Sequence, residues 1–330
     1  MTILITGAAG YIGSHTALAL RASGYDVVLL DDLSTGSRRL LPDGLPFCQG
    51  HVADTALLLG LLREHRVTAV MHFAGSIVVP DSVADPLGYY RNNSFASAAL
   101  IEACVEAGVG RFIFSSTAAV YGLPDRLPVD EDAPTRPINP YGTSKLMTEW
   151  MLRDTAAAHG LRYLALRYFN VAGADPDGRS GQVGQRATHL IKVACEAAVG
   201  RRDRIQVFGT DYDTPDGTCV RDYIHVSDLA EAHVAALRRL EAGGPSEALN
   251  CGYGRGYSVR QVLDTVQRIA GRPLEIVAAA RRPGDPPSLV CTSDRLRDRL
   301  AWQPRYDDLE QIVGTALAWE RKLSETTTEA

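Results

Sequence analysis

The sequence has no long hydrophobic run and no surplus of basic residues. Its 330 residues include 34 Lys and Arg against 39 Asp and Glu, a formal net charge of -5. A chain without a basic surplus has little to release counterions from nucleic acid. No apolar segment approaches the roughly 20 residues that cross a bilayer. We therefore expect neither a nucleic-acid partner nor a membrane partner.

Cysteine is sparse and scattered. None of the six cysteines forms a Cys-x-x-Cys pair. In a chain of this length they are typical of small core residues in a reducing compartment, and they indicate neither a disulfide framework nor a metal site. The first apolar run begins at Thr2, which leaves no room for a signal peptide. We expect a cytoplasmic location.

The N-terminus has the pattern of a strand, a glycine-rich turn and a helix. Residues 2–6 are β-rich, Gly7, Gly10 and Gly13 follow, and residues 14–21 have helical spacing. In that context Gly7 permits a tight turn, Gly10 a close backbone approach to a pyrophosphate, and Gly13 close helix packing. The spacing is Gly-x-x-Gly-x-x-Gly instead of Gly-x-Gly-x-x-Gly, so a plain turn between strand and helix stays the alternative.

Two acidic residues, Asp31 and Asp32, follow the next strand-like run at residues 25–30. An acid about 20 residues beyond a glycine loop suits a ribose diol and repels a 2′-phosphate, so Asp31 favours NAD over NADP. Arg38 and Arg39 lie a little further on. We interpret them as a solvated turn in preference to a 2′-phosphate site.

Strand-like and helical segments alternate through the first half of the chain. Helices are expected at residues 57–66 and 87–107, and strands at 69–73 and 111–115. This alternation predicts right-handed crossovers and a parallel sheet. We expect an α/β fold: a Rossmann-like doubly wound sheet in residues 1–170 and a smaller α/β substrate domain in residues 171–330. Residues near 220–245 are candidates for packing back on the first domain.

A tyrosine and a lysine four residues apart, Tyr141 and Lys145, would project from one face of a helix. Lowering a tyrosine pKa from about 10 to about 7 requires roughly 4 kcal/mol. An ammonium about 5 Å away, at an effective dielectric of about 20, supplies roughly 3 kcal/mol. A second positive charge, such as that of oxidised nicotinamide, would supply the rest. The alternative is an ordinary exposed helix.

Ser115, Ser116 and Thr117 end the strand that precedes this helix. They stand at the carboxyl edge, where doubly wound sheets bind ligands. Hydroxyls at a strand end are often only caps for the next turn. Their position before Tyr141 favours convergence of a hydroxyl, a tyrosine and a lysine on one substrate oxygen.

These motifs, together with His72-Phe73-Ala74-Gly75, resemble the extended short-chain dehydrogenase/reductase family. The blocks at residues 166–170, 198–202, 220–226 and 281–285 resemble the UDP-glucose 4-epimerases within that family. The match runs in order from Met1 to about Tyr306.

The resemblance implies an isomerase of nucleotide-sugar metabolism that interconverts UDP-glucose and UDP-galactose with tightly bound NAD. Tyr141 would take the proton from the sugar 4-hydroxyl while hydride passes from C4 to the nicotinamide. Lys145 would lower the tyrosine pKa and hold the nicotinamide ribose, and Thr117 would bond the 4-oxygen. The 4-keto sugar would then rotate and take the hydride back on its other face. The resemblance also implies a homodimer, formed through the catalytic helix and the helix at residues 87–107.

Other contacts are assigned by the same resemblance. Those to the cofactor are Gly7, Gly10, Tyr11, Ile12, Gly13, Asp31, Asp32, His51, Val52, Phe73, Ala74, Gly75, Asn92, Ser115, Tyr141, Lys145 and Phe169. Those to the substrate are Thr117, Tyr141, Asn170, His189, Leu190, Gln206, Phe208, Arg221, Arg282 and Asp285. Arg221 and Arg282 would take the diphosphate oxygens and Asp285 the uridine ribose. Without the resemblance, a surface salt bridge would be the preferred interpretation of both arginines.

Three positions depart from the family pattern. His51 stands where the family usually has an aspartate that accepts a bond from the adenine amino group; a neutral imidazole still accepts one. His189 replaces an asparagine seen in some relatives. Leu289 occupies a position that helps set pocket size near the sugar C2 substituent, and it neither clearly admits nor clearly excludes an N-acetyl group.

Three other functions are weighed against this one. The same chemistry on UDP-xylose/arabinose, a UDP-uronate or a UDP-N-acetylhexosamine stays open. A nucleotide-sugar 4,6-dehydratase needs an Asp-Glu pair after the active-site threonine, and Thr117 is followed by Ala118-Ala119. A non-catalytic NAD-binding protein is disfavoured because Thr117, Tyr141 and Lys145 are all present.

Overall fold

A seven-stranded parallel sheet forms the centre of the molecule in the computed structural model, which describes residues 1–184, 188–282 and 285–328. The strand order is β10-β6-β5-β4-β1-β2-β3. The strands are β1 (Thr2–Thr6), β2 (Asp26–Asp31), β3 (Phe47–Gln49), β4 (Val67–His72), β5 (Arg111–Thr117), β6 (Arg162–Tyr168) and β10 (Glu247–Cys251). The strand order reverses between β1 and β4, which is where doubly wound sheets bind ligands. The predicted Rossmann-like fold is confirmed.

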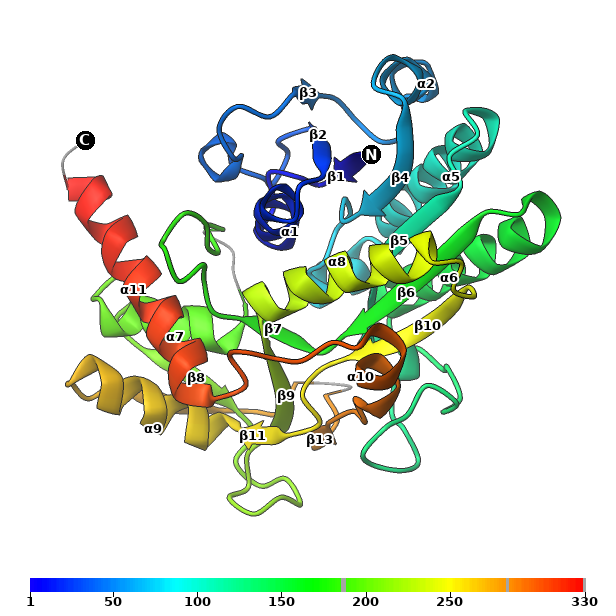
Figure 1. The fold of residues 1–330 in the computed structure, drawn as a ribbon. Coiled ribbons are helices and arrows are strands. Elements are labelled where there is room, and N and C mark those ends of the chain that lie inside the picture. The colour runs from blue at the N-terminus through cyan, green and yellow to red at the C-terminus, as the bar shows by residue number, and fades with distance from the viewer. Residues whose placement is uncertain (185–187, 283–284, 329–330) are drawn as a thin grey trace.

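Helices cover both faces of this sheet (Figure 1). Alternate residues along each strand point to opposite faces, so Ile3 and Ile5 pack with α1 (Tyr11–Ala22) and α8 (Val226–Glu241). Leu4 packs on the other face, with α2 (Thr55–Glu64), α5 (Ala96–Glu106) and α6 (Pro140–His159). Burial on both faces explains why the strands read as continuous apolar runs.

The helix expected at residues 87–107 is built in three parts. These are α4 (Pro86–Tyr89), the wider π-helical turn η2 (Tyr90–Phe95) and α5. A π-helical turn of this kind often accompanies a functional site. Asn92 and Asn93 lie in it.

Most of the second half of the chain forms smaller sheets beside the central one. Strands β7 (Asn170–Ala172), β9 (Val220–His225), β11 (Gly256–Ser258) and β13 (Ser288–Leu289) make one sheet, and β8 (Ile205–Phe208) pairs with β12 (Ile276–Ala279). The remaining helices are α3 (Val79–Ala84), α7 (Leu190–Ala198), α9 (Val259–Ala270), α10 (Asp294–Leu300) and α11 (Leu309–Thr328), with the short turns η1 (Arg38–Leu40) and η3 (Ala118–Tyr121).

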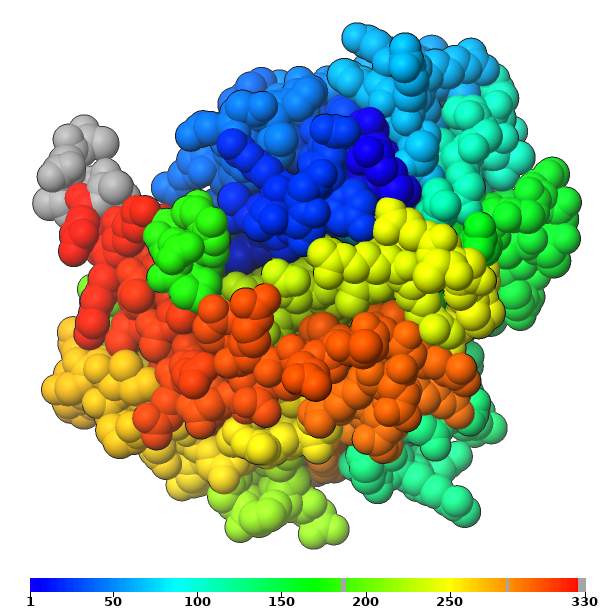
Figure 2. Space-filling view, viewed as in Figure 1, coloured from blue at the N-terminus to red at the C-terminus, as the bar shows by residue number. Residues whose placement is uncertain are grey.

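Elements from the second half of the sequence pack among those of the first half. β10 joins the central sheet and α8 packs on α1, although both come from beyond residue 170. Figure 2 shows α8 as a yellow-green band between the blue N-terminal part and the orange C-terminal part. A domain boundary at residue 170 stays a prediction. Among the described helices, none has both the length and the apolar character needed to span a bilayer.

Candidate active site

The glycine loop connects β1 to α1 and packs against the backbone that follows β4, with no space for side chains at Gly7 and Gly13. Gly7 has a φ of +70°, and a Cβ there would lie 2.5 Å from the backbone nitrogen of Ala74. A Cβ on Gly13 would lie 2.2 Å from the Gly7 carbonyl oxygen. Helix α1 begins at Tyr11 and Ile12 with Gly10 as its N-cap, without a capping side chain. Its first amides therefore remain available to an anion.

Asp31 fastens this loop to the end of β2. Its Oδ2 accepts a hydrogen bond from Ala9 N (2.9 Å) and its Oδ1 from Leu33 N (2.8 Å). Burial raises the pKa of Asp31, and these two N–H donors oppose the rise. Asp32 stabilises the turn that follows β2. Its Oδ1 accepts hydrogen bonds from the backbone nitrogen (2.9 Å) and the hydroxyl (2.6 Å) of Ser34. Each Asp31 oxygen keeps a lone pair for a further donor such as a ribose hydroxyl.

Gly36, in the segment that follows β2, packs closely against the glycine loop, and sequence reasoning missed it. A Cβ on Gly36 would lie 2.9 Å from Asp31 Oδ1. The same stretch forms η1, where Arg38 donates from Nη2 to Gln49 Oε1 (2.7 Å). The Arg38 guanidinium lies 5.1 Å from the Phe47 ring centroid. This contact gives the exposed arginine a defined place beside β3.

His51 has its hydrogen-bonding roles fixed by neighbours. Its Nδ1 accepts from Ala53 N (3.1 Å), so the neutral ring carries its proton on Nε2, which faces Asn92 Oδ1 at 3.3 Å. Asn92 in turn donates to the Ser76 hydroxyl (2.8 Å). Val52, the next residue, is buried. Nε2 is therefore a donor in this arrangement, and the adenine contact of His51 stays a prediction.

The turn after β4 is held by Asn93, which sequence reasoning did not single out. Asn93 Oδ1 accepts from Ser76 N (2.7 Å), and its Nδ2 donates to the Ser144 hydroxyl on α6 (2.9 Å). A Cβ on Gly75 would lie 3.0 Å from that same Oδ1. Phe73 continues the sheet by donating from its nitrogen to Thr6 O (3.0 Å). The adjacent asparagines in the sequence were the available signal, but only the π-helical turn shows which one reaches α6.

Tyr141, Lys145 and Thr117 meet at the end of β5. The Lys145 ammonium is buried and donates to Ser115 O (2.9 Å); burial lowers its pKa to about 8. Burial raises the pKa of Tyr141, and a hydrogen bond with the Thr117 hydroxyl opposes that rise. Thr117 Oγ1 also accepts from Ala119 N (3.1 Å). Thr117 is therefore the neighbour that counters the effect of burial on the pKa of Tyr141.

The start of α6 lies close against η3, which brings Tyr141 to Thr117. Asn139 caps α6 by accepting from Gly142 N (2.8 Å). A Cβ on Gly142 would lie 2.6 Å from Ala119 O. The glycine between the tyrosine and the lysine thus permits the close approach of the helix.

The residues predicted to hold the nucleotide form two contacts. Arg221 Nη2 donates to Asp285 Oδ1 (2.9 Å), and Leu289 pairs with Arg221 between β13 and β9. The Arg282 guanidinium lies 3.9 Å from the Phe208 ring centroid.

Other residues that were predicted to bind the substrate or the cofactor lie in or next to β7, α7 and β8. His189 is the N-cap residue of α7, next to Leu190, and its Nδ1 lies 2.8 Å from Gln182 Nε2. Burial lowers the pKa of His189. Asn170 begins β7, just after Phe169, which packs against a small cluster that includes Tyr121. Gln206 is exposed on β8, between two buried residues.

Comparison with known proteins assigns the chain. Residues 3–252 match the model of the NAD dependent epimerase/dehydratase family. The chain belongs to this family. It is 59% identical to a UDP-glucose 4-epimerase of Azospirillum brasilense over 99% of this chain and 94% of that one.

Solved structures of the family agree. The UDP-glucose 4-epimerase of Brucella ovis in complex with NAD superposes with a TM-score of 0.93 at 46% identity, covering 96% of this chain and 97% of that one. The enzyme of Bifidobacterium longum in complex with NAD+ and UDP gives 0.92 at 37% identity, covering 98% of both chains.

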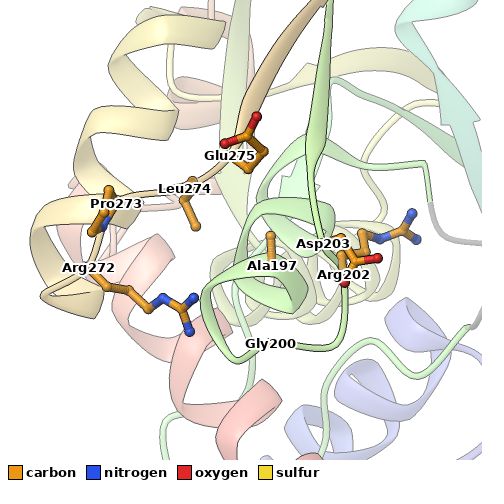
Figure 3. A pocket seen from close by; sticks show the side chains of 8 residues that line it. All are labelled: Ala197, Gly200, Arg202, Asp203, Arg272, Pro273, Leu274 and Glu275. Carbon is orange, nitrogen blue, oxygen red and sulfur yellow. The ribbon is translucent and has the colours of Figure 1, made fainter.

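A pocket of about 410 Å³ is lined in part by Gly200 and Arg202, from the epimerase-like block at residues 198–202. It lies between the turn at Gly200 and the segment from Arg272 to Glu275 that leads into β12 (Figure 3). Its two arginines are already engaged: Arg202 pairs with Glu196 (2.6 Å), and Arg272 donates to Ala198 O (3.5 Å). None of the predicted site residues lines it.

Proposed function

We propose that this chain is a UDP-glucose 4-epimerase, which interconverts UDP-glucose and UDP-galactose. The observation that carries the proposal is the meeting of Tyr141, Thr117 and Lys145 at the end of β5, next to the glycine loop at the switch point of the sheet. The relatives named above support the choice of substrate.

NAD is the cofactor, and the residues present fit it. The side-chain-free cradle of Gly7 and Gly13 and the uncapped start of α1 suit its pyrophosphate, and Asp31 suits the adenosine ribose. When bound, NAD supplies the hydride acceptor and a positive charge beside Tyr141. Lys145, buried below the turn at Gly75, is the residue proposed to hold the nicotinamide ribose.

The chain's own residues handle the proton at the sugar 4-oxygen. Tyr141 takes the proton from the 4-hydroxyl and later returns it, acting as base and then as acid. Thr117 donates a hydrogen bond that favours the phenolate. Lys145 contributes a second positive group, and its depressed pKa of about 8 leaves it mostly protonated at neutral pH. The sugar must turn between the two proton transfers, so the protein holds it mainly by the nucleotide.

Arg221, Arg282, Asp285 and Phe208 are the proposed nucleotide handle. The Arg221–Asp285 ion pair holds both groups in place, and a guanidinium fork suits diphosphate oxygens. Arg282 over Phe208 joins a second cation to an aromatic face on which a uracil ring can lie.

The proposed assembly is a homodimer in the cytoplasm. Val83, Leu87, Phe95 and Trp150 are all exposed, and they lie on α3, α4, η2 and α6, which pack together. Large exposed apolar side chains on elements that pack together favour an interaction surface. A second copy of the chain is the proposed occupant, and sedimentation equilibrium measures the mass that tests it.

An NMR time course of the purified protein with UDP-galactose and no added cofactor tests the function. We expect UDP-glucose to appear, because NAD travels with the protein. Tyr141→Phe is the control and should cut turnover by 10²-fold or more, the effect of losing a general acid–base group. Activity that requires added NAD would mean weak cofactor retention. Silence even with added NAD would refute the glucose/galactose assignment and favour another UDP-sugar.

A further inference from the structure

A buried ion pair joins α6, the helix that carries Tyr141 and Lys145, to β6 of the central sheet. Glu149 of α6 receives two hydrogen bonds from Arg167 of β6, Nε to Oε1 at 3.0 Å and Nη2 to Oε2 at 2.7 Å. Both side chains are nearly inaccessible, with 7% and 8% exposure. A two-pronged pair of this kind fixes direction as well as distance.

Glu149 also ties the catalytic helix to the strand that carries Thr117. Its Oε1 accepts a hydrogen bond from the hydroxyl of Ser116, the residue before Thr117 (2.5 Å). Glu149 follows Lys145 by four residues and Tyr141 by eight, so the three side chains share one face of α6. The Glu149 carboxylate therefore links the face of α6 that bears Tyr141 to the end of β5, next to Thr117.

The same pair extends to η3 and β10. Arg167 Nη1 donates to the Tyr121 hydroxyl (2.8 Å), which donates to Asn250 Oδ1 (2.7 Å). Asn250 Nδ2 continues the chain to Val129 O (3.1 Å). All these groups have partners, so the network is a rigid frame around the start of α6.

We propose that Glu149 and Arg167 are positioning residues that set the alignment of Tyr141 with Thr117. Neither is among the residues proposed above to bind the substrate or the cofactor. Arg167 orients the Glu149 carboxylate, and the carboxylate fixes the separation between α6 and the end of β5 through Ser116. The inference rests on the proposed function, because it assigns these residues to the proton transfer at the sugar 4-oxygen.

The alignment matters because the Thr117 hydroxyl is the group that favours the Tyr141 phenolate. If the helix and the strand end move apart, this hydrogen bond lengthens and the tyrosine becomes a weaker base at neutral pH. A displacement of about 1 Å at reacting groups is enough to cost up to about 10²-fold in rate.

Ser116→Ala is the test variant, because it removes the hydroxyl bond to Glu149 and leaves the ion pair intact. Glu149→Gln is the more obvious change, but it leaves the buried Arg167 without its counter-charge and endangers folding. Thr148→Ala is the matched control: Thr148 is as buried as Ser116 and lies in α6 beside Glu149, but among the described residues its hydroxyl bonds only within α6, to Ser144 O (3.2 Å).

We expect Ser116→Ala to lower kcat roughly tenfold with KM for UDP-galactose unchanged, and Thr148→Ala to leave kcat near the wild-type value. The pH profile of kcat should shift upward in Ser116→Ala only. Equal kcat and equal pH profiles in Ser116→Ala and wild type would overturn the proposal.

A second readout does not depend on turnover. The ultraviolet absorbance of the phenolate is titrated in NAD-loaded protein, with Tyr141→Phe subtracted to isolate Tyr141. A higher Tyr141 pKa in Ser116→Ala than in wild type and Thr148→Ala supports the positioning role. An unchanged pKa overturns it. If wild-type protein epimerises nothing, the proposed function fails while this titration still decides the alignment.

Discussion

Lys145 is the buried cation of the site, and its surroundings set how its charge responds to pH. It is 3% exposed, and burial lowers its pKa from 10.5 to about 8. The hydrogen bond that its ammonium donates to Ser115 O does not offset the lost hydration. The same burial puts the ammonium where a bound ribose and the Tyr141 hydroxyl can meet it.

A pH-dependent difference in stability between wild type and Lys145→Met follows from this shift. Between about pH 8 and 10.5 the unfolded chain binds the lysine proton and the folded chain does not, so wild-type stability rises with pH relative to the variant. From pH 7 to 9.5 the gain is about 2 kcal/mol. Urea unfolding of both cofactor-free proteins at the two pH values measures it. If the difference in the free energy of unfolding between the two proteins is the same at both pH values, burial does not lower the pKa of Lys145.

At the scale of elements, the contact between the glycine loop and α1 is the closest in the cofactor cradle. Gly13 lies in α1 with the Gly7 carbonyl where its Cβ would be, whereas a Cβ on Gly60 in α2 would meet nothing within 4 Å. The two helical glycines therefore differ in space and not in backbone conformation.

Gly13→Ala is expected to abolish NAD retention and epimerisation, because α1 must move away from the loop to admit one methyl group. Gly60→Ala is expected to keep full activity and to raise the free energy of unfolding by about 0.5–1 kcal/mol, the usual gain of alanine over glycine in a helix. Gel filtration followed by absorbance of bound NAD, together with urea unfolding, measures both effects. Full NAD retention in Gly13→Ala would show that the cradle tolerates a side chain.

The sequence predicted strands and helices correctly where the information that determines them is local. Strands near 25–30 and 111–115 appear as β2 and β5 because buried parallel strands are short apolar runs. The single helix at 87–107 was only partly right, since the π-helical turn η2 interrupts it. No local pattern indicates that turn, because it places Asn93 against Ser76 and Ser144, which are distant in sequence.

The same limit applies to the site. Tyr141 and Lys145 were recognisable because the chemistry depends on spacing within one helix. The Glu149–Arg167 pair and the close approach at Gly36 join segments that only the fold brings together. The mutual position of Thr117 and Tyr141 likewise depends on Gly142 meeting Ala119 O, a contact between two elements.

At the scale of the whole molecule, four buried histidines are held neutral. Burial lowers the pKa of His15 and His233 to about 4 and of His72 and His225 to about 3. They lie in α1, β4, β9 and α8, and are therefore distributed over both faces of the central sheet and the sheet beside it. Each makes neutral hydrogen bonds, such as that of His225 Nε2 with Thr315 Oγ1 (3.0 Å).

These histidines predict steep acid unfolding. Between about pH 6.5 and 4 each takes up a proton only in the unfolded chain, so the free energy of unfolding falls as pH drops. Four protons correspond to a slope of up to roughly 5 kcal/mol per pH unit near pH 5. Buried carboxyls with raised pKa values, such as Asp31 and Asp222, bind protons in the folded state and reduce this slope.

Urea unfolding at pH 7, 6 and 5 measures the slope, and one histidine can be removed at a time. His225→Gln keeps hydrogen-bonding groups and is expected to reduce the slope by about one proton, or about 1.4 kcal/mol per pH unit. His159→Gln makes the same substitution at an exposed position near the end of α6 and is the matched control. The comparison uses slopes, so a constant loss of stability in either variant does not affect it. If His225→Gln unfolds with the wild-type slope, His225 binds a proton in the folded protein over the same pH range, and the hydrogen bond from Ser227 N to a neutral Nδ1 is lost there.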